Sequence, residues 1–246
     1  MHTGNLALQA ASILEMNLRI LHVGAHAGQE IELYTEHGLD DVYWVEPLPN
    51  AIHELRKKVE NKRVIPFAVW SRPDSMKLQI ANNDVSSSFF EFAESNPFLN
   101  RETVSEILVE CVTLDRIIRE FLPQDDKKLI VVLDIQGSEH EALNGLNLQV
   151  MKNLIGVVVE VSETPIYKGA AEAKEVRGHL RAEGFSGCLS LVRSPTNHGD
   201  ELFLRNSYLW DFGRLFRIIC LRFTTSVSLM LFLCIQRGKQ SDSPGN

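Results

Sequence analysis

The chain has 246 residues, of which 44% are hydrophobic and 23% are charged, and its formal net charge is −7. These values are typical of a soluble globular protein with room for one large α/β domain. The negative charge argues against a nucleic-acid partner, which normally requires a basic surface.

The cysteines are scattered along the chain and show neither the spacing of a zinc site nor that of a small disulfide framework. Reduced cysteines are typical of cytoplasmic proteins, and the N-terminal residues show no secretory signal pattern. We therefore expect a cytoplasmic protein, and we predict no metal site. The four cysteines are Cys111, Cys188, Cys220 and Cys234.

Residues 1–18 are predicted to form an N-terminal helix, because apolar side chains recur at helical spacing over Leu6–Met16. The main domain, residues 19–206, begins with an apolar strand that breaks at Gly24, and a helix opens near Gly28. A glycine turn between a strand and a helix exposes backbone N–H groups at one place. Such groups can bind an anionic or polar part of a cofactor.

A second apolar strand, Val42–Val45, is followed by Glu46, which lies 22 residues after Gly24. An acid about 20 residues beyond a glycine turn has the spacing at which the hydroxyls of a nucleotide ribose are bound. Each feature also has a purely structural explanation, because the glycines can be turn residues and an exposed glutamate can simply be solvated. Together the two features favour a site for a nucleoside cofactor.

The turn Gly24–Gly28 differs from the dinucleotide fingerprint, since His26 stands where that fingerprint has its second glycine. A side chain there would crowd a pyrophosphate, so a nicotinamide-dependent oxidoreductase is disfavoured. The methionine arm of S-adenosylmethionine (SAM) is thinner, and we predict SAM as the cofactor. The residues predicted to bind it are Gly24, Ala25, His26, Gly28, Glu46 and Ala68.

A third strand is predicted at residues 63–69, so the chain up to this point reads as β-α-β-α-β and implies a parallel sheet. The segment 71–110 is less regular, apart from a short strand at 76–80. Its Ser86–Phe90 stretch is either a surface loop or a lid over a substrate. An amphipathic helix over Leu114–Phe121 follows.

The clearest buried strand is the aliphatic run Leu129–Leu133, which is followed directly by Asp134. Ser138 and Glu141 fit a capping box that would start the next helix. A further strand is predicted at Ile155–Val161. Two final β segments are expected to close the sheet as a hairpin, around residues 185–192 and 201–205.

The C-terminal tail, residues 207–246, has an apolar part and a polar, disordered end. Its apolar run, 223–235, has 13 residues and is shorter than the roughly 20 that a membrane-spanning helix needs, so no transmembrane span is predicted. The tail is compatible with docking on the domain, with contact to a second subunit, or with contact to a membrane surface.

These segments resemble the FkbM-type SAM-dependent methyltransferases over roughly residues 19–206. The resemblance implies an α/β, Rossmann-like class I methyltransferase fold: a mostly parallel seven-stranded sheet with helices on both faces, strand order three-two-one-four-five and an antiparallel pair at the end. It also implies methyl transfer to a hydroxyl group of a small molecule, such as a sugar or a polyketide. The matching segments are Val23–Gly28, Trp44–Pro47, Val112–Asp115, Asp134–Glu139, Glu160, Tyr167–Gly169, Gly184–Phe185 and Asp200–Phe203.

One position departs from the family pattern. His22 stands where the family usually carries an acid that helps to hold the cofactor at the turn. We expect His22 to be a hydrogen-bonded histidine at the end of its strand rather than a catalytic group. The departure leaves a second hypothesis open, in which the chain is a non-catalytic cofactor-binding or scaffold protein.

Methyl transfer to a hydroxyl requires alignment of the acceptor and removal of its proton. Asp134 is the first candidate for the base, or for the residue that orients the substrate, because open α/β sheets bind ligands at this edge. Glu139 and His140 complete the set of catalytic candidates. The structural alternatives are that Asp134 bonds nearby backbone and that Glu139 only favours its helix dipole. Asp134, Glu139 and Glu160 could also hold a divalent cation, but their spacing does not support one.

Overall fold

The computed structural model describes residues 4–14, 18–94, 100–148, 151–191 and 198–209. The chain divides into two compact units, Met1–Asn206 and Ser207–Asn246. The predicted tail, including its apolar run 223–235, therefore lies outside the described residues from position 210 onward. Within the described ranges, no helix has the length and apolar character to cross a membrane.

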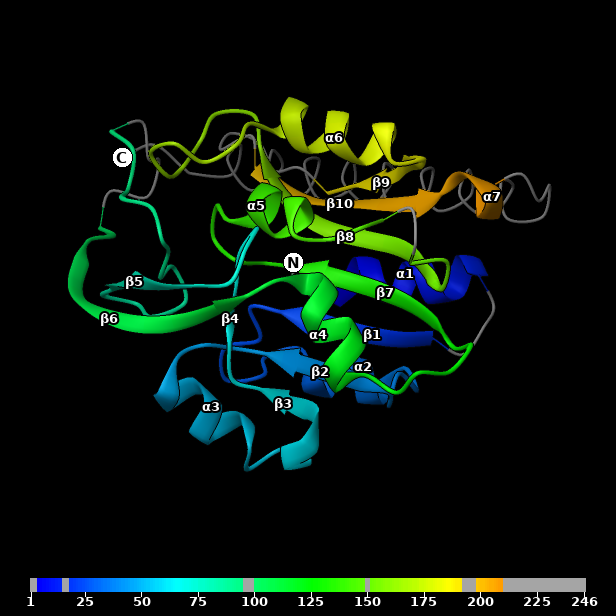
Figure 1. The fold of residues 1–246 in the computed structure, drawn as a ribbon, viewed down its shortest axis with the longest axis horizontal. Helices are drawn as coiled ribbons and strands as arrows, with labels where there is room; N and C mark the ends of the chain where they lie inside the picture. Colours follow the sequence, from blue (N-terminus) through cyan, green and yellow to red (C-terminus); the bar gives the residue numbers. More distant parts are fainter. Residues whose placement is uncertain (1–3, 15–17, 95–99, 149–150, 192–197, 210–246) are drawn as a thin grey trace, which may run out of the picture. The chain divides into compact units, whose positions relative to one another are not determined.

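The first unit is built on a seven-stranded sheet with the order β3-β2-β1-β7-β8-β10-β9 (Figure 1). Strand β10 runs antiparallel to both of its neighbours, and the other neighbouring strands are parallel. The strand order and the fold class agree with the prediction, but the prediction of one antiparallel pair is wrong, because β10 makes two antiparallel pairings. The strands are β1 (Leu18–Val23), β2 (Val42–Val45), β3 (Val64–Ile65), β7 (Lys128–Leu133), β8 (Leu154–Ser162), β9 (Phe185–Ser190) and β10 (His198–Arg205).

Helices cover both faces of this sheet, and the central strands β1 and β7 are accordingly buried along nearly their whole length. Successive side chains of a strand point to opposite faces, and Leu21 and Val23 pack with helices α4, α5 and α6 in one large core cluster. On the other face, Tyr34 of α2 packs against His22 and Trp44. The helices are α1 (Gly4–Leu14), α2 (Ile31–Glu36), α3 (Pro49–Leu55), η1 (Asn61–Arg63), α4 (Leu114–Phe121), α5 (Glu139–Asn144), α6 (Ala173–Ala182) and α7 (Asn206–Leu209).

A second sheet of three strands, in the order β4-β6-β5, lies between β3 and α4 in the chain (Figure 1). It corrects two predictions. The single strand expected at 63–69 is split into β3 and β4 (Ala68–Val69), which belong to different sheets. The short strand predicted at 76–80 is confirmed as β5 (Asp74–Ala81), but the rest of the segment, which was expected to be irregular, contains the long strand β6 (Thr103–Val112), which pairs antiparallel with β5.

Candidate functional site

The glycine turn after β1 is held against the ends of both neighbouring strands. Gly24 has φ +85°, and a Cβ at this position would collide with the backbone carbonyl of Asp134, so only glycine fits. The N–H groups of Gly24 and Ala25 both donate to the carbonyl of Val45, each at 3.0 Å. The turn therefore joins β1 to β2 and to the loop after β7.

Most N–H groups of the turn are already bonded within the protein. Besides the two bonds to Val45, the N–H of Gly28 donates to the Ala25 carbonyl at 2.8 Å, and that of His26 donates to the Glu46 carboxylate. The expectation that these N–H groups are exposed for a ligand is therefore wrong for these four residues. The tight turn satisfies its own donors, and its contribution to a site comes from its shape and side chains.

Glu46 is the centre of the arrangement that the sequence predicted. Its carboxylate accepts a hydrogen bond from the His26 N–H and another from the Leu48 N–H, both at 2.8 Å. Only 4% of the residue is exposed, and this burial raises the pKa of the carboxyl to about 7 despite the two hydrogen bonds. The two halves of the predicted motif, the turn and the acid, thus meet directly.

Asp134 lies beside the turn at the end of β7. Its N–H donates to the Val23 carbonyl at 3.0 Å, and its Oδ1 accepts a 2.7 Å hydrogen bond from Nε2 of Gln136. The same amide nitrogen lies 3.5 Å from Oε2 of Glu160, while Oη of Tyr167 lies 2.7 Å from the Gln136 Oε1. A single amide thus links the ends of two neighbouring strands, β7 and β8, to the Tyr167 turn.

Gln136 was not predicted from the sequence, although it belongs to the segment Asp134–Glu139 that carries the family resemblance. Its backbone has φ +55°, a left-handed conformation that is uncommon for a residue other than glycine. Strained residues of this kind cluster at functional sites. That strain is visible only in the structure, because the sequence around Gln136 reads as an ordinary turn.

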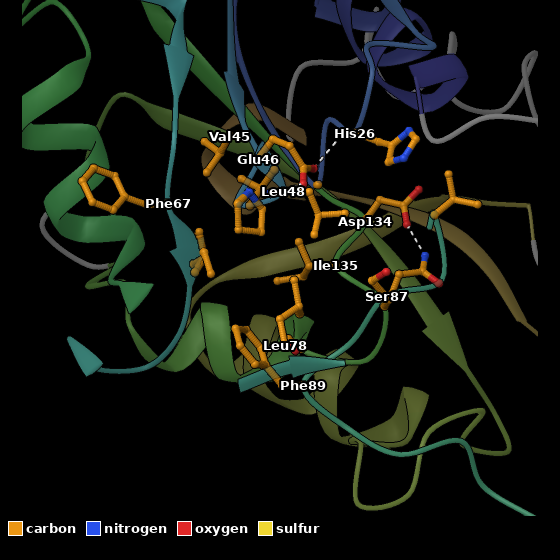
Figure 2. A pocket seen from close by; sticks show the side chains of 18 of the residues that line it. His26, Val45, Glu46, Leu48, Phe67, Leu78, Ser87, Phe89, Asp134 and Ile135 are labelled. Atoms are coloured by element: carbon orange, nitrogen blue, oxygen red, sulfur yellow. Dashed lines mark hydrogen bonds between the residues drawn. The ribbon is translucent and has the colours of Figure 1, made fainter. Parts of the chain in front are cut away.

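The turn, Glu46 and Asp134 line one pocket. Its empty volume is about 570 Å³, a figure that includes space open to solvent. In Figure 2 the side chains of His26, Glu46 and Asp134 lie across the upper part of the view, and Leu78 and Phe89 lie below Ile135. The pocket therefore has a polar and an apolar part. Apolar side chains in its wall come from Leu48, Phe67, Ala68, Val69, Leu78, Phe89 and Ile135.

Part of this wall belongs to the segment between β5 and β6, where the sequence left a surface loop and a lid as alternatives. Ser87 and Phe89 line the pocket. Ser88 is buried, and its Oγ donates a 2.6 Å hydrogen bond to the Gln136 carbonyl. The stretch is thus fastened to the loop after β7 and forms one side of the pocket.

A comparison with protein families now identifies the chain. The family model described as "Methyltransferase FkbM domain" matches residues 22–186, which is more than half of the chain. The chain belongs to the FkbM methyltransferase family.

Three of the solved structures that resemble this FkbM-family chain are methyltransferases of low sequence identity. The magnesium protoporphyrin IX methyltransferase of Synechocystis, with bound SAM, is 12% identical over 82% of this chain and 78% of its own, with a TM-score of 0.42. The ribosomal protein L11 methylase of Lactobacillus delbrueckii is 8% identical (82% and 77% covered, TM-score 0.44), and a SAM-dependent methyltransferase of Aquifex aeolicus is 13% identical (82% and 89%, TM-score 0.43). A search among curated protein sequences finds no match.

Of the residues predicted for cofactor binding in this FkbM domain, Gly24, His26, Glu46 and Ala68 line the pocket together with Asp134. Ala25 and Gly28 do not line it. Ala25 is fully buried, and a Cβ at Gly28 would collide with the side chain of Ile31. These two residues therefore support the conformation of the turn and do not face the pocket.

Glu139 and His140 are not brought to the same pocket. They line a second pocket, together with Glu160 and Tyr167. The Glu139 carboxylate is buried, which raises its pKa to about 7, and it accepts hydrogen bonds from the N–H groups of Ile135 and Gly137, each at 3.0 Å. The predicted capping box is therefore wrong: the Ser138 side chain makes no cap bond, and Glu139 binds the loop N–H groups instead.

His22 is a buried, hydrogen-bonded histidine, as expected. Its Nδ1 lies 3.0 Å from Oη of Tyr34, and its ring stacks on Trp44. Burial lowers its pKa to about 3, so the ring is neutral at physiological pH. Its Nε2 lies 3.9 Å from the carboxylate of Glu30, which is also buried. No group of three His, Cys, Asp or Glu side chains within the described ranges could hold a metal ion.

Proposed function

We propose that this FkbM-family chain is a SAM-dependent methyltransferase that methylates a hydroxyl oxygen of a small molecule, such as a sugar or another secondary metabolite. The observation that carries the proposal is the convergence of Gly24, Glu46 and Asp134 on one pocket at the carboxyl edge of a parallel sheet. Open α/β sheets bind their ligands at this edge.

The residues of the pocket fit the cofactor part by part. The Glu46 oxygens each accept one backbone hydrogen bond and keep lone pairs for the two ribose hydroxyls. The apolar part of the wall suits the faces of the adenine ring. The pocket carries the carboxylates of Glu46, Asp84 and Asp134 and no lysine or arginine among its described lining residues, which suits a positively charged sulfonium.

Asp134 is the proposed base. SAM supplies a methyl group on a sulfonium, which is already activated for displacement. As the oxygen–carbon bond to the acceptor forms and the sulfur–carbon bond breaks, the hydroxyl proton passes to the Asp134 carboxylate. The Gln136 amide donates a 2.7 Å hydrogen bond to this carboxylate and holds it in place.

The proposal also covers the location of the protein and its partners. The proposed location is the cytoplasm, where a thiol such as that of Cys111 stays reduced. We propose three parts of the chain: an N-terminal helix (1–18), the catalytic domain (19–206) and a tail (207–246). The partner of the catalytic domain is the small-molecule acceptor. The proposed partner of the tail is a second subunit or a membrane surface.

A methyl-transfer assay tests the proposed reaction. With radiolabelled SAM and a panel of hydroxylated sugars and related metabolites, the wild-type protein should label at least one compound on oxygen. Asp134→Asn should lower that rate by about 100-fold, because it removes the base. Asp115→Asn, on the exposed face of α4 where Asp115 pairs with Arg119, is the matched control and should leave the rate unchanged. An equal rate in Asp134→Asn would contradict the role of Asp134.

The second candidate function is a non-catalytic cofactor-binding or scaffold protein. It is favoured by His22 at the family's acidic position and by the internal hydrogen bonds that occupy the N–H groups of Gly24, Ala25 and His26. Tight SAM binding without methyl transfer to any acceptor would support a cofactor-binding role. No SAM binding by the folded protein would support a scaffold.

A further inference from the structure

The wall of the pocket contains a buried hydroxyl group that has no hydrogen-bond partner among the described residues. Ser138 precedes α5 and is 1% exposed, and its Oγ makes no hydrogen bond to any residue that the structure describes. A buried polar group without a partner destabilises a protein, so such groups are rare and call for an explanation.

The local structure gives this hydroxyl no role of its own. The N-cap role that the sequence predicted for Ser138 is absent, because its side chain caps no N–H group of α5. The Glu139 carboxylate bonds the N–H groups of the loop in its place. The neighbouring Ser88 shows the ordinary case, since its buried hydroxyl donates to the Gln136 carbonyl.

Ser138 lines the same pocket as Glu46 and Asp134. The carboxylates there suit ribose hydroxyls and positively charged groups. Most other lining side chains are apolar; the uncharged polar ones are His26, Ser87, Gln136 and Ser138, and of these Ser138 has the hydroxyl without a described partner. An adenine ring has apolar faces and an edge with both donor and acceptor nitrogens. A neutral hydroxyl can donate to such an edge and accept from it, whereas a leucine or phenylalanine side chain cannot.

We propose that the Ser138 hydroxyl is a binding group for the adenine base of the cofactor. This inference rests on the proposed function, because it requires a nucleoside cofactor in this pocket. Ser138 then carries no partner in the free protein because its partner is the ligand. The residue trades stability of the free protein for affinity, as functional sites commonly do.

The test is Ser138→Ala, measured by calorimetric titration with S-adenosylhomocysteine and with 5′-methylthioadenosine, which share only the nucleoside and its sulfur. Both affinities should fall by about 3- to 10-fold, the loss expected for one hydrogen bond. The melting temperature of the ligand-free variant should equal or exceed that of the wild type, because no protein hydrogen bond is lost.

Ser186→Ala is the control. Ser186 lies on β9, and its Oγ makes a 2.7 Å hydrogen bond to Oδ1 of Asn206. This variant should melt at a lower temperature and keep both affinities. Unchanged affinities in Ser138→Ala, or a loss for S-adenosylhomocysteine alone, would overturn the assignment to the base. If the wild type binds neither compound, the proposed function itself fails, and the inference fails with it.

Discussion

Three carboxyl groups near the glycine turn and the loop after β7 are buried, and burial raises the pKa of each to about 7: those of Glu30, Glu46 and Glu139. Backbone hydrogen bonds offset part of this cost for all three carboxyls, and Glu30 also lies beside the neutral His22. A carboxyl whose pKa is higher in the folded state binds its proton more tightly there than in the unfolded chain. It therefore favours the folded state at low pH and loses this advantage as the pH rises from about 4.5 to 7.

Glu30 offers a direct test of this argument. Glu30→Gln removes the titration while keeping the shape of the side chain. The melting temperature of the variant relative to the wild type should therefore increase between pH 5 and pH 8, because only the wild type must bury a charge at the higher pH. Differential scanning calorimetry at several pH values gives this comparison. A difference that stays constant, or that decreases as the pH rises, would show that Glu30 keeps an ordinary pKa.

At the level of elements, the pocket depends on the three-stranded sheet and on the segment between β5 and β6. Two contacts fasten this segment to the main sheet: Oγ of Ser88 bonds the Gln136 carbonyl, and Tyr167 Oη lies 3.1 Å from the Ser86 carbonyl. Phe89 then packs edge-on against Trp70, next to β4. The apolar side of the pocket is thus held in place from two directions.

Ser88→Ala should loosen this side of the pocket. Loss of the 2.6 Å bond leaves the Gln136 carbonyl without this donor, so we expect faster amide hydrogen exchange over residues 83–92. Thr103→Ala is a suitable control, because Thr103 is exposed and its Oγ1 bonds only the side chain of Gln79 among the contacts described. Exchange that is unchanged in Ser88→Ala would mean that other contacts hold the segment.

The elements also show what the sequence can and cannot predict. The aliphatic strand β7 and the amphipathic helix α4 were predicted within a residue of their bounds, because each has a strong local pattern. Strand β6 was missed because most of its residues are exposed, with polar and apolar side chains mixed, and because its pairing partner β5 lies far away in sequence. At the site, the meeting of the turn with Glu46 was predicted from spacing, but the role of Gln136 was not, since it depends on three side chains from separate elements.

At the scale of the whole domain, the carboxyl ends of the parallel strands carry the pocket, and their amino ends carry a network of ion pairs. The pocket lies at the carboxyl ends of β1, β2 and β7, whereas Asp41 lies before the start of β2, at the opposite edge. Asp41 pairs with Arg19, Arg63 and Lys127 at 2.9 to 3.1 Å. Although desolvation raises its pKa, these partners outweigh that effect and hold the pKa of Asp41 below its usual value.

Asp41→Asn should therefore lower stability and leave the site intact. Loss of three charge-assisted hydrogen bonds in a partly exposed network should cost about 2 kcal/mol of unfolding free energy. Because the pKa of Asp41 is lowered in the folded state, its contribution is present above pH 4 or so and disappears as the pH falls further. Urea unfolding at pH 7 and pH 3 should show a smaller difference between variant and wild type at pH 3, with unchanged SAM affinity at pH 7. A loss of SAM affinity would contradict the separation of the two edges.

The central claim is that the glycine turn and Glu46 form the binding site of a nucleoside cofactor. Calorimetric titration with SAM tests it most directly, on the wild type, on Glu46→Ala and on the control Glu54→Ala, whose exposed carboxylate pairs only with Lys57 on the surface of α3 among the ion pairs described. The account predicts micromolar binding by the wild type and by Glu54→Ala, and an affinity at least about tenfold lower in Glu46→Ala. A folded wild-type protein that binds no SAM, or a folded Glu46→Ala variant that binds it equally well, would contradict the account.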